Sequence, residues 1–300
     1  MKKNITKTLI IALSIETLIL VGLLGYLITT VPVDPNKGSA PSFPFINNIG
    51  KQANDPKKYE EYRQLFDENK QINEDYVGEL TFDSGLISES FVQARSCFRR
   101  DGQMYRFYNE DGSLVTSPAG YNGNDVYIWT YWKTGEYDYN DHGGSVFMDY
   151  RNEIDDQNLI IYGHHFSEWN DETRQKAFTP LEKLLLEENY AENANVTMVL
   201  DHEIRHYVVA CVYEFDVTDE TYWDNCQYWR TQYDYDDYSG TADDSYFARY
   251  IDTMKQVRLY DTGVELTPED KTLTLQTCIS GHTGLIYEVV VLKLAETETY

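Results

Sequence analysis

Short runs with β character dominate the chain after residue 75, and clusters of Gly, Asn and Asp separate many of them. Many short strands with few long helices predict a mainly β fold, either a closed barrel or a sandwich. The expected strands cover residues 76–82, 90–94, 125–132, 144–148, 159–162, 195–200, 206–215, 271–277 and 286–294.

Helical spacing of apolar residues marks a few segments between and before these runs. Residues 56–74 carry Tyr59, Tyr62, Leu65 and Phe66 at helical intervals among charged residues, which predicts an amphipathic helix covering one face of a domain. A short helix is expected at residues 180–189 and a longer one at residues 245–257, before the last two strands.

The N-terminal part differs in composition from the rest. Residues 1–7 hold three lysines and no acid, residues 8–31 form a mainly apolar run in which Glu16 is the only charged residue, and residues 32–56 are rich in Pro and Gly. An uncleaved anchor is expected at 8–31, with 1–7 in the cytoplasm and 32–56 as a linker. A cleaved signal peptide is the alternative. We therefore expect a single-pass plasma-membrane protein whose domain at residues 57–300 is extracellular.

The net charge of -25 limits the classes of partner. With no basic stripe to displace phosphate counterions, nucleic-acid binding is excluded, and the acidic surface is expected to keep the domain soluble. Residues 233–244 are rich in Tyr and Asp, but they do not fit the EF-hand pattern and predict a solvated loop rather than a calcium site. The four cysteines form no CxxC pair, and a Cys211–Cys226 bridge remains an alternative to buried thiols.

Two predicted strands end in residues suited to chemistry. Residues 158–162 run into Gly163, His164 and His165, and an imidazole at a strand end can exchange protons near neutral pH. A His-His pair also suits a metal, but no third ligand stands at motif spacing, so no metal or cofactor is expected. Residues 271–277 lead into Cys278, and a thiol at a strand end is accessible to a substrate.

Taken together, these two segments resemble the sortases, most closely class B. Residues 161–165 (Ile-Tyr-Gly-His-His) are similar to the family's Tyr-Gly-His strand, and residues 273–278 (Leu-Thr-Leu-Gln-Thr-Cys) to its Thr-Leu-x-Thr-Cys strand. Further similar segments, in the same order as in the family, are residues 144–149, 178–181 and 259–264.

The resemblance implies an eight-stranded sortase-type barrel with an N-terminal helix and a longer helix before the Cys strand. It implies a cysteine transpeptidase in which Cys278 attacks a backbone carbonyl in the sorting signal of a secreted protein. A thioester forms, and an amine of a cell-wall precursor or a pilin resolves it. By the same match, His164 is the acid/base partner and Thr277 touches the substrate.

One part of the family pattern is missing. Sortases carry an Arg on the strand after the Cys, and the matching position here is Tyr287, followed by Glu288. Loss of one oxyanion donor costs about 10²–10³ in rate, and a nearby carboxylate raises a thiol pKa. Three interpretations follow: the Tyr287 hydroxyl replaces the Arg, an Arg from elsewhere in the chain, such as Arg205 or Arg258, reaches the groove, or the protein is a weak or inactive sortase that still binds peptides. A cysteine hydrolase using water as acceptor is a further alternative.

Overall fold

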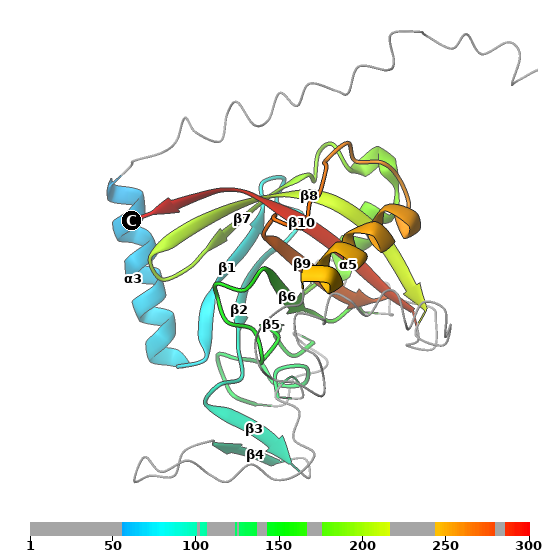
Figure 1. Cartoon of the computed structure of the whole chain (residues 1–300). Coiled ribbons are helices and arrows are strands. Elements are labelled where there is room, and N and C mark those ends of the chain that lie inside the picture. The colour runs from blue at the N-terminus through cyan, green and yellow to red at the C-terminus, as the bar shows by residue number, and fades with distance from the viewer. Residues whose placement is uncertain are drawn as a thin grey trace, which may run out of the picture. The chain divides into compact units, whose positions relative to one another are not determined.

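Eight strands close into a barrel in the computed structural model, which describes residues 56–100, 103–106, 124, 126–136, 143–166, 176–216, 244–279 and 286–300 (Figure 1). Around the barrel the strands follow the order β1-β2-β5-β6-β9-β10-β8-β7. Their bounds are β1 Tyr76–Phe82, β2 Ser88–Val92, β5 Val146–Met148, β6 Asn158–Tyr162, β7 Asn195–Val199, β8 Glu203–Asp216, β9 Thr272–Cys278 and β10 Ile286–Thr299. The prediction of a mainly β, eight-stranded barrel is confirmed.

Successive side chains along each strand point to opposite faces of the sheet, so one set of apolar residues forms a core inside the barrel and the other forms a core on its outside. On β10, Val290 and Leu292 pack inside the barrel, whereas Val289 and Val291 pack on the outside. Helix α5 (Asp244–Val257) covers that outer face with Phe247 and other apolar side chains (Figure 1). Because both faces of β9 are covered, its residues from Thr272 to Thr277 are all buried.

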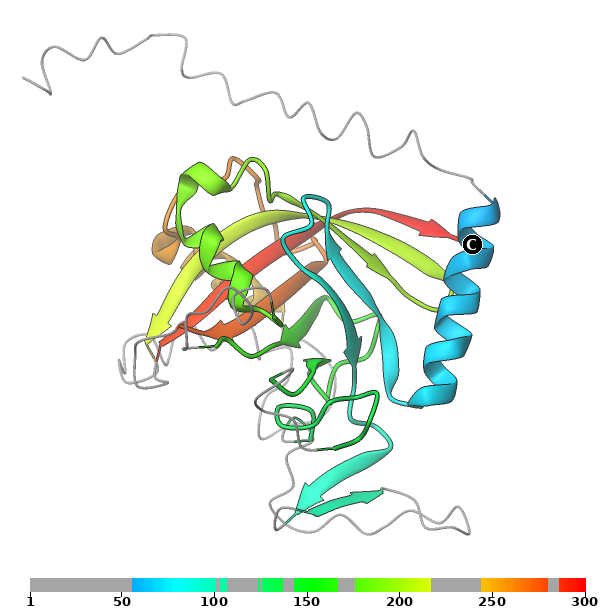
Figure 2. The ribbon, with the colours of Figure 1, turned by 180° about the vertical axis from the view of Figure 1, so that it is seen from behind.

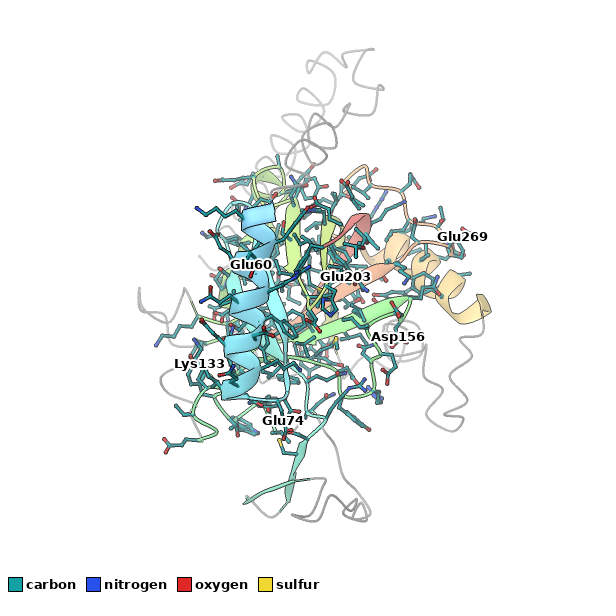
Figure 3. All side chains as sticks on the ribbon, turned by 90° about the vertical axis from the view of Figure 1, so that its left-hand side faces the viewer. Glu60, Glu74, Lys133, Asp156, Glu203 and Glu269 are labelled. Atoms are coloured by element: carbon teal, nitrogen blue, oxygen red, sulfur yellow. The ribbon has the colours of Figure 1, made fainter. Side chains whose placement is uncertain are left out.

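Helix α3 (Pro56–Ile72) lies beside β1 on another side of the barrel, as expected from its spacing (Figure 1). Its buried Phe66 packs edge-on against Tyr76 of β1, with ring centroids 5.3 Å apart. The face of α3 turned away from the barrel is polar, and Figure 3 shows Glu60 on it. The C-terminal Tyr300 stacks on Tyr59 at 5.2 Å.

Strands β6 and β9 pair in parallel, and this pairing decides where the site lies. The register aligns Ile161 with Leu275 and Asn158 with Thr272. The buried side-chain oxygen of Asn158 accepts hydrogen bonds from the Thr272 and Thr274 hydroxyls, each at 2.9 Å. Since parallel strands run in the same direction, β6 and β9 end at the same edge of the barrel.

Three segments differ from the expectations. The described residues of the predicted strand at 125–132 form turns with a single β-bridge. A side chain, and not a neighbouring strand, satisfies one backbone carbonyl there, because Ser145 donates its hydroxyl to Thr130 O at 2.7 Å. Residues 180–189 form two 3₁₀ helices, η3 (Thr179–Leu185) and η4 (Glu187–Asn189), which are visible in Figure 2. A hairpin of β3 (Cys97–Arg100) and β4 (Gln103–Arg106) was not expected.

The expectation of a single-pass plasma-membrane protein needs correction. Among the described residues no helix has both the length and the apolar content needed to cross a bilayer. Crossing takes about 20 apolar residues, whereas α3 has 17 residues and is rich in charge. The predicted segments 1–7, 8–31 and nearly all of 32–56 lie outside the described residues, as do Cys226 and residues 233–243. The described residues all belong to one unit, Phe45–Tyr300.

Candidate active site

Cys278 and His164 line one pocket of about 280 Å³ at the barrel edge where β6 and β9 end. Cys278 is the last residue of β9, and His164 follows β6 after Gly163. The parallel pairing of the two strands brings these residues together although they are far apart in sequence. The remaining lining residues are Asn124, Ile128, Phe147, Tyr162, Gly163, Gln276, Thr277 and Tyr287.

The Cys278 side chain is partly buried at the pocket wall. Burial raises the pKa of its thiol above the ordinary value, because the charged thiolate is poorly solvated there. Burial is the only cause of this shift among the described residues. The resting thiol is therefore neutral at pH 7, and a nucleophilic thiolate has to be generated by proton transfer.

The His164 ring is held between the turn at residues 126–130 and the strand ends. Its Nε2 lies 2.5 Å from Ile128 O, and its ring centroid lies 5.3 Å from that of Trp129. Burial lowers the pKa of His164, and the Ile128 carbonyl only partly offsets this. Because a carbonyl oxygen only accepts, Nε2 carries the proton in the neutral ring, and Nδ1 is the basic nitrogen.

Tyr287 faces Cys278 across the antiparallel pair of β9 and β10. Residues directly opposite in such a pair place their side chains on the same side of the sheet, which explains why both line the pocket. Thr277 is buried, and its hydroxyl donates to Gly163 O at 2.8 Å. This bond ties the end of β9 to the Gly-His turn, so Thr277 fixes the geometry of the two strand ends.

Neither Arg205 nor Arg258, the two arginines considered as substitutes for the missing family Arg, lines the pocket. Arg205 donates to Glu203 at 2.6 Å and to Ile154 O, and Arg258 is paired with Asp261 at 2.9 Å. The interpretation that one of them reaches the groove is therefore wrong. The residues that line the pocket in the described part of the chain include no Arg or Lys.

Glu288 does not act on the thiol as the sequence suggested. It pairs with Thr277 rather than with Cys278, so it points to the opposite face of the sheet from Tyr287. The carboxyl is fully buried, and neither oxygen has a hydrogen-bond partner in the part of the chain that is described. Burial, with repulsion from Glu182 and Glu214, raises the pKa of Glu288 well above its usual range and so favours the protonated form.

The other described cysteines are buried away from this pocket. Burial beside Asp75 raises the pKa of Cys97 to about 12, and the Cys211 sulfur lies 3.6 Å from Met254 O beneath α5. The Cys211–Cys226 bridge is not tested, because Cys226 is outside the described residues. His165 contacts Glu182 at 3.3 Å, and no cluster of three metal-binding side chains occurs in the described ranges.

A further wall of this pocket was not expected from the sequence. It consists of Asn124, Ile128, Phe147 and Tyr162, and the Phe147 and Tyr162 rings lie 5.4 Å apart. Tyr162 stands in the motif that drew attention to His164, so its position was a usable signal. Asn124 and Ile128 carried no such signal, because their segment was expected to form a regular strand.

No family model matches the chain. The sortase B of Staphylococcus aureus (strain NCTC 8325 / PS 47) is 26% identical over 151 residues, which are 50% of this chain and 53% of that protein. The sortase B of Listeria monocytogenes serovar 1/2a is 27% identical over 157 residues, 52% of this chain and 54% of that protein. The chain thus covers about half the length of these relatives.

Solved structures extend the likeness. Clostridium perfringens sortase B superposes with a TM-score of 0.55 at 19% identity over 77% of this chain and 99% of that one. A Staphylococcus aureus sortase B–substrate complex superposes with a TM-score of 0.55 at 20% identity, covering 80% of this chain and 94% of that one. A sortase B complexed with triglycine superposes with a TM-score of 0.52 at 20% identity, covering 80% of this chain and 95% of that one.

The chain resembles class B sortases in sequence and has the sortase B fold. The resemblance expected from residues 161–165 and 273–278 is confirmed, and so is the barrel that it implied. At these identities the sortase B structures establish the fold alone.

Proposed function

We propose that the protein is a sortase-type cysteine transpeptidase. The observation that carries this proposal is that the Cys278 thiol and the His164 imidazole line one pocket at adjacent strand ends. The pocket brings together a thiol, a base and a hydroxyl donor, which are the groups that acyl transfer needs. The substrate is a sorting-signal peptide of a secreted protein, and the acceptor is an amine of a cell-wall precursor or a pilin. Two sortase B structures, one with a substrate and one with triglycine, support these classes of ligand.

The first half of the reaction forms a thioester. The Cys278 proton passes to Nδ1 of His164 while the sulfur bonds to the carbonyl carbon of the scissile peptide. The oxyanion of the tetrahedral intermediate accepts a hydrogen bond from the Tyr287 hydroxyl, which lies on the strand opposite Cys278. The C–N bond then breaks, and His164 returns its proton to the leaving amine.

The second half reverses these roles. The acceptor amine attacks the thioester carbon and gives a proton to His164, a new amide forms, and the sulfur leaves and is reprotonated. A neutral resting pair suits this cycle, because burial disfavours both the thiolate and the imidazolium. The thiolate and imidazolium charges are then formed only during the reaction cycle and not in the resting enzyme.

The test is the intact mass of the protein after mixing with candidate sorting-signal peptides. A covalent acyl adduct mapping to Cys278 is expected, and Cys278→Ala should lack it. Cys211→Ala is the matched control, because that sulfur is buried beneath α5 and should leave the adduct unchanged. Adding triglycine should release the acyl group as a longer peptide, whereas release only as free acid identifies a hydrolase.

A second candidate is a peptide-binding protein on the same scaffold that does not catalyse transfer. It is favoured by one observation, the lack of an Arg or Lys among the described pocket residues. This candidate predicts that peptide binding survives Cys278→Ala and that no thioester forms. Detection of an acyl adduct on Cys278 would rule it out.

A further inference from the structure

A buried ion pair lies behind the pocket. The Asp149 carboxylate is fully buried next to the Arg151 side chain, which is only 7% exposed. Arg151 donates from Nε to Asp149 Oδ1 at 2.8 Å and from Nη2 to Oδ2 at 2.6 Å, and its backbone N–H donates to Oδ1 at 3.0 Å. These bonds hold the pKa of Asp149 below its usual value, so a permanent negative charge sits in the protein interior.

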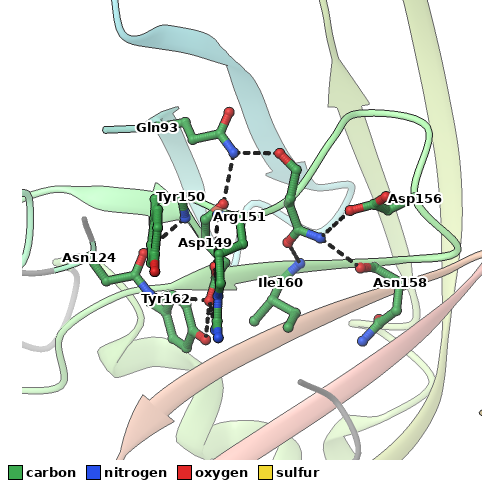
Figure 4. A network of polar contacts seen from close by, with 10 residues as sticks. Gln93, Asn124, Asp149, Tyr150, Arg151, Asp156, Asn158, Ile160 and Tyr162 are labelled. Atoms are coloured by element: carbon green, nitrogen blue, oxygen red, sulfur yellow. Dashed lines mark hydrogen bonds and ion pairs between the residues drawn. The ribbon is translucent and has the colours of Figure 1, made fainter. Parts of the chain in front are cut away.

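The same carboxylate binds two groups that line the pocket. Asp149 Oδ2 accepts a hydrogen bond from the Tyr162 hydroxyl at 3.0 Å and one from Asn124 Nδ2 at 3.1 Å (Figure 4). Asn124 is fixed a second time, because its side-chain oxygen accepts the Tyr150 N–H at 3.0 Å. Tyr162 and Asn124 come from different segments, and the carboxylate is the point at which they are joined.

Asp149 is itself anchored to the barrel. Its backbone N–H donates to Ile160 O at 2.9 Å, and its carbonyl accepts from the Gln93 side chain at 2.7 Å. The neighbouring Asn152 accepts a hydrogen bond from Ile160 N at 2.8 Å and donates one to Asn158 O at 3.0 Å. The charge therefore cannot shift without disturbing β6, the strand that leads into His164.

We infer that Asp149 is a positioning residue for the substrate-facing wall of this pocket. It acts through Tyr162 and Asn124, holding the phenol ring against Phe147 and the Asn124 amide at the same carboxylate oxygen, in the pocket that Cys278 also lines. Without this anchor the Tyr162 hydroxyl and the Asn124 amide each lose one of the contacts that hold them, so this wall of the pocket is less rigidly preformed for a peptide. The inference concerns the site of the proposed transpeptidase and rests on that function for its role with peptides.

Site-mapped thiol labelling tests the geometry without any transpeptidase activity. The full chain is treated with iodoacetamide, which is small, and with a maleimide carried on a hexapeptide, which has to lie along the wall. Variants are Tyr162→Phe, which removes only the anchored hydroxyl, Asn124→Ala, Asp149→Asn and the double variant Asp149→Asn/Tyr162→Phe. Tyr260→Phe is the matched control, since it removes a buried hydroxyl that donates to Leu184 O at 2.7 Å outside the pocket.

Iodoacetamide rates at Cys278 should stay within about twofold of the native rate, because a small probe does not need the wall. Labelling by the peptide maleimide should fall about tenfold in Tyr162→Phe and Asp149→Asn, and the double variant should fall no further than Asp149→Asn alone. Tyr260→Phe should match the native protein. Where an acyl adduct forms, the same variants should raise KM more than they lower kcat.

Two results would overturn the inference: native peptide-maleimide rates in Tyr162→Phe and Asn124→Ala, or losses in the double variant that equal the product of the single losses. If Asp149→Asn does not fold, as a buried unpaired Arg151 would favour, the Tyr162→Phe and Asn124→Ala pair decides the question. A native protein that labels as expected but forms no acyl adduct would defeat the proposed function and leave this inference standing.

Discussion

Tyr287 stands directly across from Cys278 in the β9–β10 pair. Directly opposed side chains in an antiparallel pair have Cβ atoms about 4.5–5.5 Å apart. Tyr287 thus occupies, on the strand after the nucleophile, the position matched to the missing arginine, and it presents a neutral donor instead of a cation.

If the Tyr287 hydroxyl stabilises the oxyanion, Tyr287→Phe should lower the rate of acyl-enzyme formation by about 10²–10³ with little change in KM. Tyr287→Arg should recover part of the rate, because a guanidinium also donates to an oxyanion. Single-turnover mass spectrometry measures both. A Phe variant as fast as the native protein would remove Tyr287 from the mechanism.

The reactivity of Cys278 should depend on pH in a defined direction. Its pKa is raised by burial, so at pH 7 its thiolate fraction is below that of an ordinary cysteine with a pKa of about 8.5. Iodoacetamide labelling of Cys278 should therefore be slower at pH 7 in the folded protein than in the denatured chain, and it should still be rising at pH 9. A plateau below pH 8 in the folded protein would contradict the neutral resting thiol.

Gly163 is confined by Phe178. A Cβ added at Gly163 would lie 2.6 Å from Cγ of the Phe178 ring. Gly163→Ala should lower the free energy of unfolding by about 1–3 kcal/mol through overpacking and move His164 away from the pocket. Denaturant unfolding measures the loss, and Phe178→Leu in the same chain should restore part of it. If Gly163→Ala and the native protein had the same free energy of unfolding, the Phe178 ring would have to move aside without cost, and the prediction would be wrong.

Glu288 should make stability fall as the pH rises. Its pKa is raised in the folded protein, so the unfolded chain releases the proton first, near its ordinary pKa of about 4.3. Above that pH the group lowers the free energy of unfolding by about 1.4 kcal/mol per pH unit until the folded pKa is reached.

Glu288→Gln should therefore be more stable than the native protein at pH 7 and should lose this slope between pH 5 and 7. The exposed Glu188→Gln is the matched control, with no expected effect. Unfolding curves at several pH values provide the measurement. A Glu288→Gln protein less stable than the native one at pH 7 would indicate a partner for the carboxyl.

Most of the barrel could be predicted because its strands carry a local signal. The stretches that became β1, β6, β9 and β10 are short, apolar and bounded by turns, so their places followed from the sequence. The segment at 126–132 has the same composition but no regular partner. Close packing of Gly144 against the Ile128 and Tyr127 carbonyls holds it instead, and that is a tertiary contact.

The candidate site was predictable only in part. Cys278 and His164 stand in recognisable motifs, whereas the anchoring of Tyr162 by Asp149 joins separate segments and leaves no local pattern. The direction of Glu288 follows from strand register, which sequence alone does not fix. The expected membrane location rested on residues 8–31, and nothing in the described helices supports it.

The Asn158 bonds to Thr272 and Thr274 have a consequence for the fidelity of folding. A slip of β9 by two residues against β6 would keep every side chain on its own face, so the core would still close. It would also shift the sulfur along the strand by about 7 Å relative to the imidazole, the rise of two strand residues. The Asn158 bonds to Thr272 and Thr274 form only in the native register, so they favour the alignment that places Cys278 and His164 in one pocket.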